Sequence, residues 1–372
     1  MSRILVLNCG SSSVKYRLYD GDQVRDKGTV ERVGEPGGGP ADHESAVRGI
    51  IDRLDLTGLA GVGHRVVHGG RKFSEPVLID DAVFAAIEDL VPLAPLHNPA
   101  NLAGIRVARE ALPDTPQVAI FDTAFHHTLP EAVATYAIDR EVAQRYGIRR
   151  YGFHGTSHAY VSRRAADLLG RPYAESNMIT LHLGNGASAC AVQGGRSVAT
   201  SMGMSPLEGL VMGTRSGDLD PTVIFHLRRE AGLGVDEIDD LLNHRSGLLG
   251  LTGVNDMREV LARRDAGDAA AALAFDVYCR RITSYVGGYY ALLGRVDAVV
   301  FTAGVGEHAA PVRAASLAGL ERLGIAVDPA RNAGSGDRVI SPDGAEVAVC
   351  VIGTDEEREI ARETREVLAA AG

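Results

Sequence analysis

A strand, a glycine-containing turn and a second strand occur in that order twice in this chain, about half a chain length apart. The first copy covers residues 3–19 and the second covers residues 179–192. Both copies begin with a short apolar run bounded by turn residues, which is typical of a buried strand. When the copies are aligned on the glycine of the turn, the matching positions are Gly10 with Gly186, Leu5 with Leu181, Leu7 with Leu183 and Ser12 with Ser188. The repeat predicts two halves that are built alike, with a ligand bound between them.

Beyond the repeated unit, strands and helices alternate in both halves. Buried strands are expected at 117–122 and 296–303, an Ala-rich helix at 268–293 and a closing helix at 355–370. The length of 372 residues favours two to three domains. Together these features predict an α/β protein of two similar domains.

Turn and cap residues predict three local features. Asn98 is expected to cap a helix whose first residue is Pro99. The glycine-rich stretch 246–253 is expected to be a loop, and Gly304 and Gly306 are expected to lie in a turn after a strand.

Charge and cysteine content exclude several classes of protein. The formal net charge of -10 argues against nucleic acid as a partner, since phosphate contacts along a nucleic acid need a basic surface. No apolar run approaches the roughly 18 residues of a membrane span, and the N-terminal apolar run is too short for a signal peptide. The four cysteines are far apart and form no Cys-x-x-Cys pair, so free thiols in a reducing cytoplasm are expected.

Residues 202–221 form a long stretch without helix or strand periodicity. The stretch holds four glycines, two prolines and one arginine, Arg215, and its Met, Leu and Val content is typical of ordered chain. Two interpretations fit. The stretch is either an active-site loop that presents Arg215 to an anion, or a structural connection in which Arg215 forms a salt bridge.

Polar residues at or within predicted strands are further candidates for a site. Asp122 ends a strand, where open α/β sheets meet their ligands, so it is a candidate for metal binding or acid–base chemistry, or for a helix cap. Arg65 lies in an apolar strand and therefore requires a partner or a ligand. His154 and His158 are spaced i, i+4 but lack the glutamate of a zinc-protease motif.

Two enzyme classes remain open from these features. The segment from Gly304 to Ala309 fits a dinucleotide fingerprint loosely, which would suit a nicotinamide-dependent enzyme. A phosphotransferase without a P-loop would need turns that hold phosphates, acids that hold Mg²⁺ and arginines that neutralise the moving phosphoryl group. The chain offers all of these groups, namely the two Gly/Ser turns, Asp122, Glu356, Arg65 and Arg215. Phosphotransfer therefore accounts for more of the sequence.

Eight sequence blocks, in the same order as in a known family, carry a resemblance over nearly the whole chain. They are residues 7–15, 64–70, 94–99, 121–126, 151–158, 182–186, 202–221 and 301–307. In these blocks the chain resembles the acetokinase family of the sugar kinase/Hsp70/actin superfamily. The resemblance implies two actin-like (ribonuclease H-like) α/β domains with a nucleotide cleft between them. Their expected extents are residues 1–124 plus 358–372 and residues 125–357.

The resemblance also implies an activity. The family transfers the γ-phosphoryl group of ATP reversibly to acetate, giving acetyl phosphate and ADP, with Mg²⁺ or Mn²⁺. It implies a homodimer, while the cysteines, the net charge and the apolar runs predict a cytoplasmic protein without nucleic-acid or membrane partners. A nucleotide-binding scaffold of the Hsp70/actin kind is the non-catalytic alternative, which would keep both phosphate turns but would not need Arg65, Arg215 and a methyl-sized pocket.

Site residues follow from the resemblance position by position. The implied catalytic residues are Arg65, Asp122, His154 and Arg215, and the implied metal ligands are Asn8 and Glu356. The implied pocket for the acetate methyl group consists of Val67, Leu96, Phe153 and Pro206. The implied ATP-binding residues are Ser13, Lys15, His182, Leu183, Gly184, Asn185, Gly186, Asp256, Met257, Arg258, Gly304, Val305, Gly306 and His308. The family usually has Asn at the position of His308.

The chemistry of such a transfer agrees with these roles. A carboxylate and a polyphosphate repel each other, so Arg65 and Arg215 with Mg²⁺ would cancel the repulsion and hold the reactants in line. Acetate is already ionised at neutral pH and needs no general base, so Asp122 is expected to align Mg²⁺ through a water. His154 is expected to donate a hydrogen bond to the developing charge during direct transfer. A phosphohistidine intermediate is the alternative.

Overall fold

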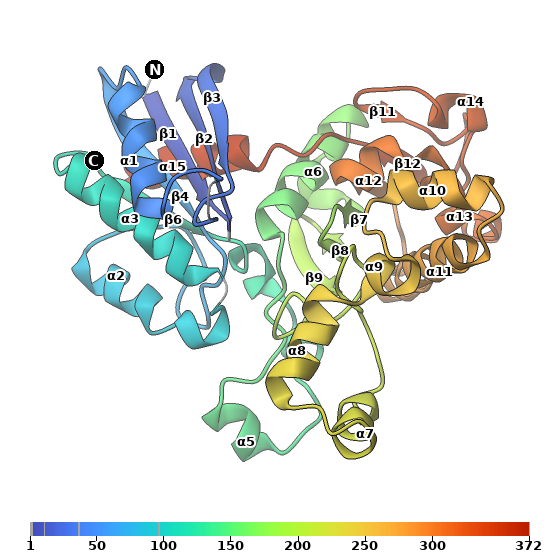
Figure 1. Cartoon of the computed structure of the whole chain (residues 1–372). Coiled ribbons are helices and arrows are strands. Elements are labelled where there is room, and N and C mark those ends of the chain that lie inside the picture. The colour runs from blue at the N-terminus through green and yellow to red at the C-terminus, as the bar shows by residue number, and fades with distance from the viewer. Residues whose placement is uncertain (1–2, 11, 36–37, 96, 372) are drawn as a thin grey trace. The chain divides into compact units, whose positions relative to one another are not determined.

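The computed structural model describes residues 3–10, 12–35, 38–95 and 97–371. The chain divides into two compact units, which are described separately (Figure 1). The first unit comprises Met1–His127, Gly155–Ser157 and Asp355–Gly372, and the second comprises Thr128–His154 and His158–Thr354. The domain boundaries expected from the sequence, after residue 124 and before residue 358, stay a prediction.

The first unit is built on a six-stranded sheet in the order β3-β2-β1-β4-β6-β5. Its strands are β1 (Arg3–Cys9), β2 (Ser13–Asp20), β3 (Gln23–Glu31), β4 (Leu59–Val66), β5 (Val77–Leu78) and β6 (Gln117–Phe121). β1, β2 and β3 form an antiparallel meander, whereas β1, β4 and β6 are parallel. The carboxyl ends of three neighbouring strands therefore meet at one edge.

Helices cover both faces of this sheet because the side chains of β1 alternate between two apolar cores. Leu5 and Leu7 pack with residues of α1 and α3, and Ile4 and Val6 pack with Ile360 of α15. The helices of this unit are α1 (His43–Arg53), α2 (Asp81–Glu88), η1 (Val91–Leu93), α3 (Asn98–Ala111) and α15 (Glu356–Ala371), and η2 (Ala124–Thr128) leads out of it.

The second unit repeats the same sheet. Read from its meander, its strand order is β9-β8-β7-β10-β12-β11, in which each strand takes the place of its counterpart in the order β3-β2-β1-β4-β6-β5 of the first sheet. The strands are β7 (Asn177–Leu183), β8 (Ala187–Gln193), β9 (Arg196–Thr200), β10 (Ala298–Thr302), β11 (Arg338–Val339) and β12 (Ala348–Val351). The directions match as well, since β7, β10 and β12 are parallel and β11 is antiparallel. The prediction of two halves built alike is confirmed.

The longest helix of the second unit is α11, which contacts β7 and β8. Its buried positions 271, 274, 278, 282 and 286 recur every three to four residues, which makes one apolar stripe. The helices of this unit, α11 included, are α4 (Glu131–Ala134), α5 (Arg140–Arg145), α6 (Gly155–Leu168), η3 (Tyr173–Glu175), α7 (Thr222–Glu230), α8 (Val235–His244), α9 (Gly247–Thr252), α10 (Met257–Asp265), α11 (Ala269–Leu293), α12 (Ala303–His308), α13 (Ala310–Leu317), η4 (Glu321–Leu323) and α14 (Pro329–Asn332). No helix in the described part of the chain is both long and apolar enough to span a bilayer.

Three local predictions were wrong. His97, not Asn98, is the residue before α3, and the Asn98 side chain instead bonds the backbone of His68 on both sides, at 3.2 Å each. The expected loop 246–253 contains α9, whose first turn donates its Leu248 N–H to the Met212 carbonyl at 2.9 Å. The expected turn at 304–306 lies inside α12. In each case tertiary contacts override the weak local preference of glycine and asparagine.

Candidate active site

The carboxyl edge of the first sheet carries three polar side chains. Asn8 is the penultimate residue of β1, Arg65 is the penultimate residue of β4, and Asp122 directly follows β6. Because β4 lies between β1 and β6, these side chains share one edge of the sheet, the place where parallel sheets meet their ligands.

Arg65 and Asp122 form a buried ion pair. Nε of Arg65 donates to both carboxylate oxygens, at 3.0 and 3.1 Å, and Nη2 donates to Oδ2 at 2.5 Å. Nη1 donates to Oδ1 of Asn8 at 3.2 Å. Burial lowers the pKa of Arg65, but the carboxylates of Asp122 and Glu356 outweigh burial and leave the pKa raised. The partner that the sequence required for Arg65 is therefore Asp122.

Asp122 is held on its other side too. Its side chain is almost fully buried, and Oγ1 of Thr156 donates to Oδ1 at 3.3 Å. Its backbone N–H donates to the Val66 carbonyl at 3.0 Å, and its carbonyl accepts from the N–H of Gly155 at 2.9 Å. Asp122 is thus a fixed anion with both oxygens engaged.

Glu356 is the first residue of α15 and is half-buried. Burial raises the pKa of Glu356, Arg65 lowers it, and the charges of Asp122 and Glu357 raise it again, so that the pKa is raised overall. The ionised carboxylate is therefore short of positive charge, which a cation would supply. With the amide oxygen of Asn8, Glu356 offers the oxygen donors that Mg²⁺ prefers, and Mg²⁺ takes few carboxylates when phosphates and waters complete its shell.

No group of three or more His, Cys, Asp or Glu side chains with the geometry of a metal site occurs among the residues that the structure describes. Asn8 and Glu356 supply one amide and one carboxylate oxygen donor. The donor set therefore suits a metal that shares its coordination with a substrate.

The first glycine/serine turn joins β1 to β2. The Gly10 N–H donates to the Ser13 carbonyl at 2.7 Å, and Nε2 of His43 lies 2.7 Å from the Gly10 carbonyl. Lys15 is exposed, and its charge lowers the pKa of Glu356. The turn therefore brings a cation within electrostatic reach of the candidate metal ligand.

Val67 follows β4 and is buried. Its N–H donates to Oδ1 of Asn101 at 3.0 Å, and Nδ2 of the same amide donates to the Cys9 carbonyl at 2.7 Å. The amide of Asn101 thus ties the end of β4 to the end of β1. Leu96, which was predicted for the same apolar pocket, lies outside the described residues.

The second unit contains a cavity of about 600 Å³. Residues predicted to bind ATP that line it are Gly184, Asn185, Asp256, Met257, Arg258, Gly304, Val305 and His308. They come from the turn after β7, the start of α10 and the helix α12. The other predicted ATP residues of this unit are not in the lining: His182 and Leu183 lie in β7, and Gly186 and Gly306 lie close by in the chain.

The cavity also includes residues that no sequence pattern singled out. They are Gly213, Leu248, Asn255, Leu261, Tyr278, Ala309 and Pro311. Tyr278 of α11 is buried, and its hydroxyl has no hydrogen-bond partner among the described residues. A buried hydroxyl without a partner next to a cavity is a signal of a ligand, but only the structure reveals it, because Tyr278 looks like any other residue of an apolar stripe.

The Asp256–Arg258 pair lines the cavity at the start of α10. Asp256 caps the helix by accepting from the Arg258 N–H at 2.8 Å, and its carboxylate also binds the Arg258 guanidinium. The Arg258 side chain remains 90% exposed, so it is free to turn toward a ligand.

His154 and His182 stack their rings, with centroids 4.1 Å apart. His154 precedes α6 in the left-handed region, at φ 56°, which is costly for a residue with a side chain. Its Nδ1 lies 2.9 Å from Oγ of Ser188 in β8. The strained backbone, the stack and the hydrogen bond fix the ring of His154.

The second glycine turn is locked to the loop 202–221. The Gly213 N–H donates to the Asn185 carbonyl at 2.9 Å, and a side chain on Gly213 would collide with the side-chain oxygen of Asn185. Within the turn, the Gly184 N–H donates to the Gly186 carbonyl at 3.0 Å. Glycine at 213 therefore allows the loop to approach the turn closely.

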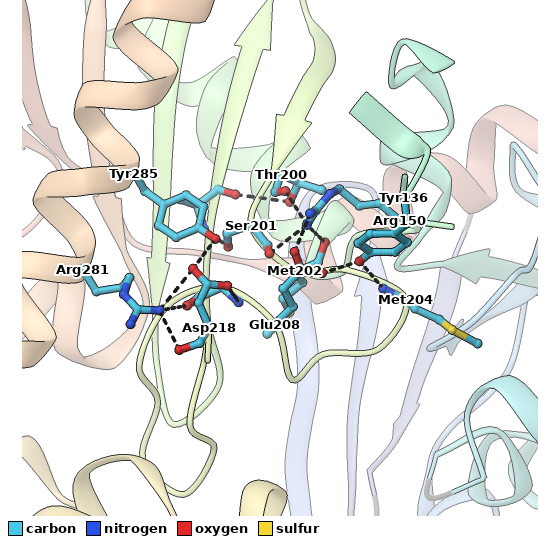
Figure 2. A network of polar contacts seen from close by, with 12 residues as sticks. Tyr136, Arg150, Thr200, Ser201, Met202, Met204, Glu208, Asp218, Arg281 and Tyr285 are labelled. Carbon is cyan, nitrogen blue, oxygen red and sulfur yellow. Dashed lines mark hydrogen bonds and ion pairs between the residues drawn. The ribbon is translucent and has the colours of Figure 1, made fainter. Parts of the chain in front are cut away.

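Two polar clusters hold the loop 202–221 in place (Figure 2). In the first, Nη1 of Arg150 donates to the carbonyls of Thr200, Ser201 and Met202 at 3.0 to 3.2 Å, and Nη2 donates to Glu208 at 2.5 Å. The hydroxyl of Tyr136 donates to the other carboxylate oxygen of Glu208 and accepts from the Met204 N–H. One arginine and one tyrosine therefore anchor the first part of the loop.

The second cluster closes the loop on itself. Asp218 accepts from the Gly209 N–H at 2.8 Å through Oδ1, and its own N–H donates to the Gly209 carbonyl at 3.0 Å. The Tyr285 hydroxyl donates to Oδ2 of Asp218 at 2.8 Å, and Arg281 pairs with the same carboxylate at 3.1 Å (Figure 2). Residues 210–217, which include Arg215, thus form a closed segment pinned to α11.

Arg215 itself has no anionic partner among the residues that the structure describes. Its Nη1 donates to the Pro206 carbonyl at 3.2 Å and lies 3.8 Å from Sδ of Met212. Burial lowers the pKa of Arg215, and no carboxylate pairs with it in the described part of the chain. The described residues therefore do not support the interpretation in which Arg215 forms a structural salt bridge. A bound anion would compensate its partly buried charge.

The structure leaves the predicted site residues in two groups. The first unit brings together Asn8, Arg65, Asp122 and Glu356, with Ser13, Lys15 and Val67 nearby. The second brings together His154, His182 and the residues of the loop and cavity, and Pro206 contacts Arg215. Phe153, predicted for the methyl pocket, is buried beside His154 in the chain.

Comparisons with known proteins agree with one another. The model of the acetokinase family matches residues 3–362. The acetate kinase of Streptomyces coelicolor is 59% identical over 400 aligned residues, which cover 100% of this chain and 98% of the relative. The crystal structure of acetate kinase from Porphyromonas gingivalis matches with a TM-score of 0.94 at 43% identity, over 99% of this chain and 100% of that one. A propionate kinase from Francisella tularensis matches with a TM-score of 0.93 at 42% identity, over 99% and 100%.

Proposed function

Because the chain belongs to the acetokinase family, we infer that it is an enzyme that phosphorylates acetate with ATP, and we propose that the transfer is direct and in line. Membership of this family removes the nicotinamide-dependent enzyme and the non-catalytic scaffold from the alternatives. The observation that carries the proposal is the half-buried guanidinium of Arg215, which pairs with no carboxylate among the described residues and lies on a loop segment pinned to α11. A transferring phosphoryl group is an anion of the kind that this cation requires.

Arg65 and Arg215 have different tasks in this proposal. The charge of Arg65 is already neutralised by Asp122, so Arg65 contributes mainly oriented hydrogen-bond donors. Its Nη1 is turned toward Asn8. Arg215 offers uncompensated charge, which stabilises the negative charge on the equatorial oxygens of the phosphoryl group. His154, fixed by its backbone and its stack on His182, completes the polar surroundings of the same group.

We propose that Asn8 and Glu356 hold Mg²⁺, or Mn²⁺ in its place. When bound, the ion supplies positive charge to the phosphate oxygens. Support comes from the raised pKa of the Glu356 carboxyl, which burial and neighbouring acids leave short of positive charge. Asp122 acts on Arg65 rather than as a base, since both its oxygens accept hydrogen bonds and acetate arrives ionised.

The cavity of the second unit is proposed as the adenosine site. It has the volume of a small-molecule pocket and is lined by the glycines Gly184 and Gly304. Gly184 belongs to the turn between two strands, where backbone N–H groups can approach phosphates. His308 lines the cavity where the family usually has Asn, so it is the residue of this chain that could alter the contact with the base.

Val67, Leu96, Phe153 and Pro206 are proposed as the wall around the acyl group. Support comes from the hydrogen bond that Arg215 donates to the Pro206 carbonyl, which ties this part of the loop to the cation that would face the carboxylate. Val67→Ala should raise the activity with propionate relative to acetate, because the loss of two methyl groups leaves room for one methylene. Equal ratios in the variant and the parent protein would show that Val67 is not part of the pocket.

The direct test of the function is an assay of ADP formation with acetate, propionate and butyrate in parallel. Acetate is expected to be the best acceptor. The propionate kinase among the similar structures makes propionate the informative competitor. Two results would contradict the proposal: ADP formation at the same rate without any carboxylic acid, and no ADP formation with any of the three acids.

The assembly and the compartment are two further proposals. A homodimer is expected from the family resemblance, and light scattering coupled to size-exclusion chromatography would test it. The cytoplasm is proposed because the four cysteines are buried as free thiols, which suits a reducing compartment. Fractionation of the producing cells would test the second proposal.

A further inference from the structure

Three buried polar side chains of the second unit form a hydrogen-bonded chain that ends on His154. Oγ1 of Thr180 lies 2.7 Å from Nδ1 of His158, and Nε2 of the same ring lies 2.8 Å from Oγ of Ser188. The Ser188 oxygen lies 2.9 Å from Nδ1 of His154. Thr180, His158 and Ser188 are fully buried, so their polar atoms must find partners within the protein.

Ser188 has one proton to share between two imidazole rings. Its hydroxyl donates to one ring nitrogen and accepts from the other. When Nε2 of His158 accepts, Nδ1 of a neutral His154 must carry a proton, and when Nε2 of His158 donates, Nδ1 of His154 must lack one. The tautomers of the two rings are therefore linked through Ser188.

Thr180 selects between the two arrangements. Its hydroxyl has the Cys190 carbonyl as an acceptor, at 3.5 Å across the β7–β8 pair. A hydroxyl that donates there accepts from Nδ1–H of His158, which leaves Nε2 of that ring as an acceptor. All hydrogen bonds that link Cys190, Thr180, His158, Ser188 and His154 are then formed. If the Thr180 hydroxyl donated to His158 instead, its bond to the Cys190 carbonyl would be lost. The proton positions are assigned from this network.

We propose that Thr180, His158 and Ser188 are positioning residues that keep the proton of neutral His154 on Nδ1 and present its Nε2 to the phosphoryl group. The role given to Nε2 rests on the proposed function. Nε2 accepts a hydrogen bond in the neutral ring and donates one to a phosphoryl oxygen only in the doubly protonated ring. The hydrogen-bonded series of Thr180, His158 and Ser188 thus controls which protonation state of His154 can assist phosphoryl transfer.

The surroundings of Nε2 suit this arrangement. A Cβ built on Gly186 would lie 3.5 Å from Nε2 of His154 and 3.5 Å from Nη1 of Arg215, so both nitrogens border the second phosphate turn. The charged or titratable groups near the ring include Arg215, the stacked His182 and, through Ser188, His158. A lone pair on Nε2 is the favourable neighbour of the Arg215 cation.

Thr180→Val and Thr180→Ser test the hydrogen-bonded series of side chains at the end farthest from His154. Valine has the shape of threonine but no hydroxyl, so Nδ1–H of His158 would lose the acceptor that Thr180 provides. The proton of His158 is expected to move to Nε2, the Ser188 hydroxyl to turn, and the proton of His154 to move from Nδ1 to Nε2. Serine keeps the hydroxyl and should keep the parent pattern.

The tautomers are measured by ¹⁵N NMR of imidazole nitrogens in the full chain without substrate, at about pH 8.5, where a histidine with an ordinary pKa is neutral. His154→Gln identifies the signals of His154. A parent protein with the proton on Nε2 of His154, or a Thr180→Val variant with the parent pattern, would overturn the proposal. Because no turnover is involved, this result is independent of whether acetate is the substrate.

Ser188→Ala tests the consequence for transfer, with Ser162→Ala as the matched control. Ser162 is another fully buried serine, on α6, whose hydroxyl bonds the Ala159 carbonyl and Tyr173 rather than a histidine. Ser188→Ala should lower kcat by about 10- to 100-fold, with KM for ATP changed by less than about threefold. Equal losses of kcat in the two variants, or a loss confined to KM, would contradict a positioning role.

Discussion

Arg65 and Arg215 are both half-buried arginines, but their surroundings have opposite consequences for stability. Arg65 neutralises Asp122, whose side chain is only 2% exposed, whereas the partners of Arg215 among the described residues are a carbonyl and a thioether. Removal of Arg65 leaves a buried carboxylate without its partner. Removal of Arg215 leaves no new unpaired charge behind, because the charge that is removed was itself unpaired.

Both Arg65→Ala and Arg215→Ala should therefore lose most of the turnover, on the order of 10³-fold, because each removes a group from the phosphoryl site. Their unfolding should differ. Arg65→Ala is expected to lose about 3 kcal/mol or more of unfolding free energy, and Arg215→Ala is expected to lose little.

Steady-state kinetics and urea unfolding followed by circular dichroism check both expectations. Arg106→Ala is a suitable control, since its ion pair with Glu44 is exposed and such pairs contribute little. Near-parental turnover in either variant would remove that arginine from the site. A large loss of stability in Arg215→Ala would show that the guanidinium has a stabilising partner besides Pro206 and Met212.

His64 predicts a pH dependence of stability. The ring is buried in β4, with Nε2 2.7 Å from Oε1 of Gln117, and burial lowers the pKa of His64 to about 4 despite that hydrogen bond. The unfolded chain binds a proton near the ordinary pKa of about 6.5, so the contribution is complete above that pH and is lost as the pH falls toward 4. Between about pH 7.5 and 5 the loss is about 2 kcal/mol for this group.

The measurement is urea unfolding at about pH 7.5 and at about pH 5 for the parent protein and for His64→Asn. The difference between the two pH values should shrink by about 2 kcal/mol in the variant, because other titrating groups act equally in both proteins. An unchanged difference would mean that His64 accepts a proton in the folded state.

At the scale of elements, the loop 202–221 depends on Asp218. This side chain closes the segment that carries Arg215, through Gly209, and anchors it to α11 through Tyr285. Asp218→Ala should lower kcat/KM for phosphotransfer by about 10- to 100-fold, since a displacement of about 1 Å in a reacting group has an effect of that size.

Asp220→Ala is the matched control for this prediction. Asp220 belongs to the same loop, but its exposed carboxylate only accepts from the Thr222 N–H at the start of α7. It should leave kcat/KM nearly unchanged. Equal effects at both positions would show that the loop as a whole, rather than the Gly209–Asp218 closure, sets the position of Arg215.

The sequence predicts most elements but not the contacts that complete the site. Period-2 and period-3.6 patterns locate β1, β7 and α11, because each buries one or both faces against a core. The same patterns miss α9 and α12, whose glycines form helix only because neighbouring segments supply hydrogen bonds and space. They also miss Thr180 and Tyr278, which lie on buried faces and acquire their roles only from side chains distant in sequence.

At the scale of the molecule, two units with the same sheet order carry different chemistry on equivalent edges. The first holds the proposed metal ligands and Arg65, and the second holds the nucleotide cavity and Arg215. Direct transfer requires one displacement at phosphorus, whereas a phosphohistidine would require two. The fold itself allows either route, so the stereochemistry of phosphorus separates them.

Transfer from ATP that is chiral at the γ-phosphorus should therefore invert the configuration. The measurement is the configuration of the isotopically labelled phosphoryl group in acetyl phosphate after a single turnover. Net retention would indicate an even number of displacements and would favour a phospho-enzyme, with His154 as the first residue to examine for a covalent phosphate.

The closing helix α15 has a consequence for the order in which the protein acquires its structure during synthesis. Ile360 and Ala361 complete a core whose other members include Ile4 and Val6 of the first strand, and Glu356 at its first position supplies a proposed metal ligand. The second unit is encoded almost entirely by residues 128–354 and can therefore leave the ribosome whole while the first unit still lacks its last helix. The half that is translated first is the half that is finished last.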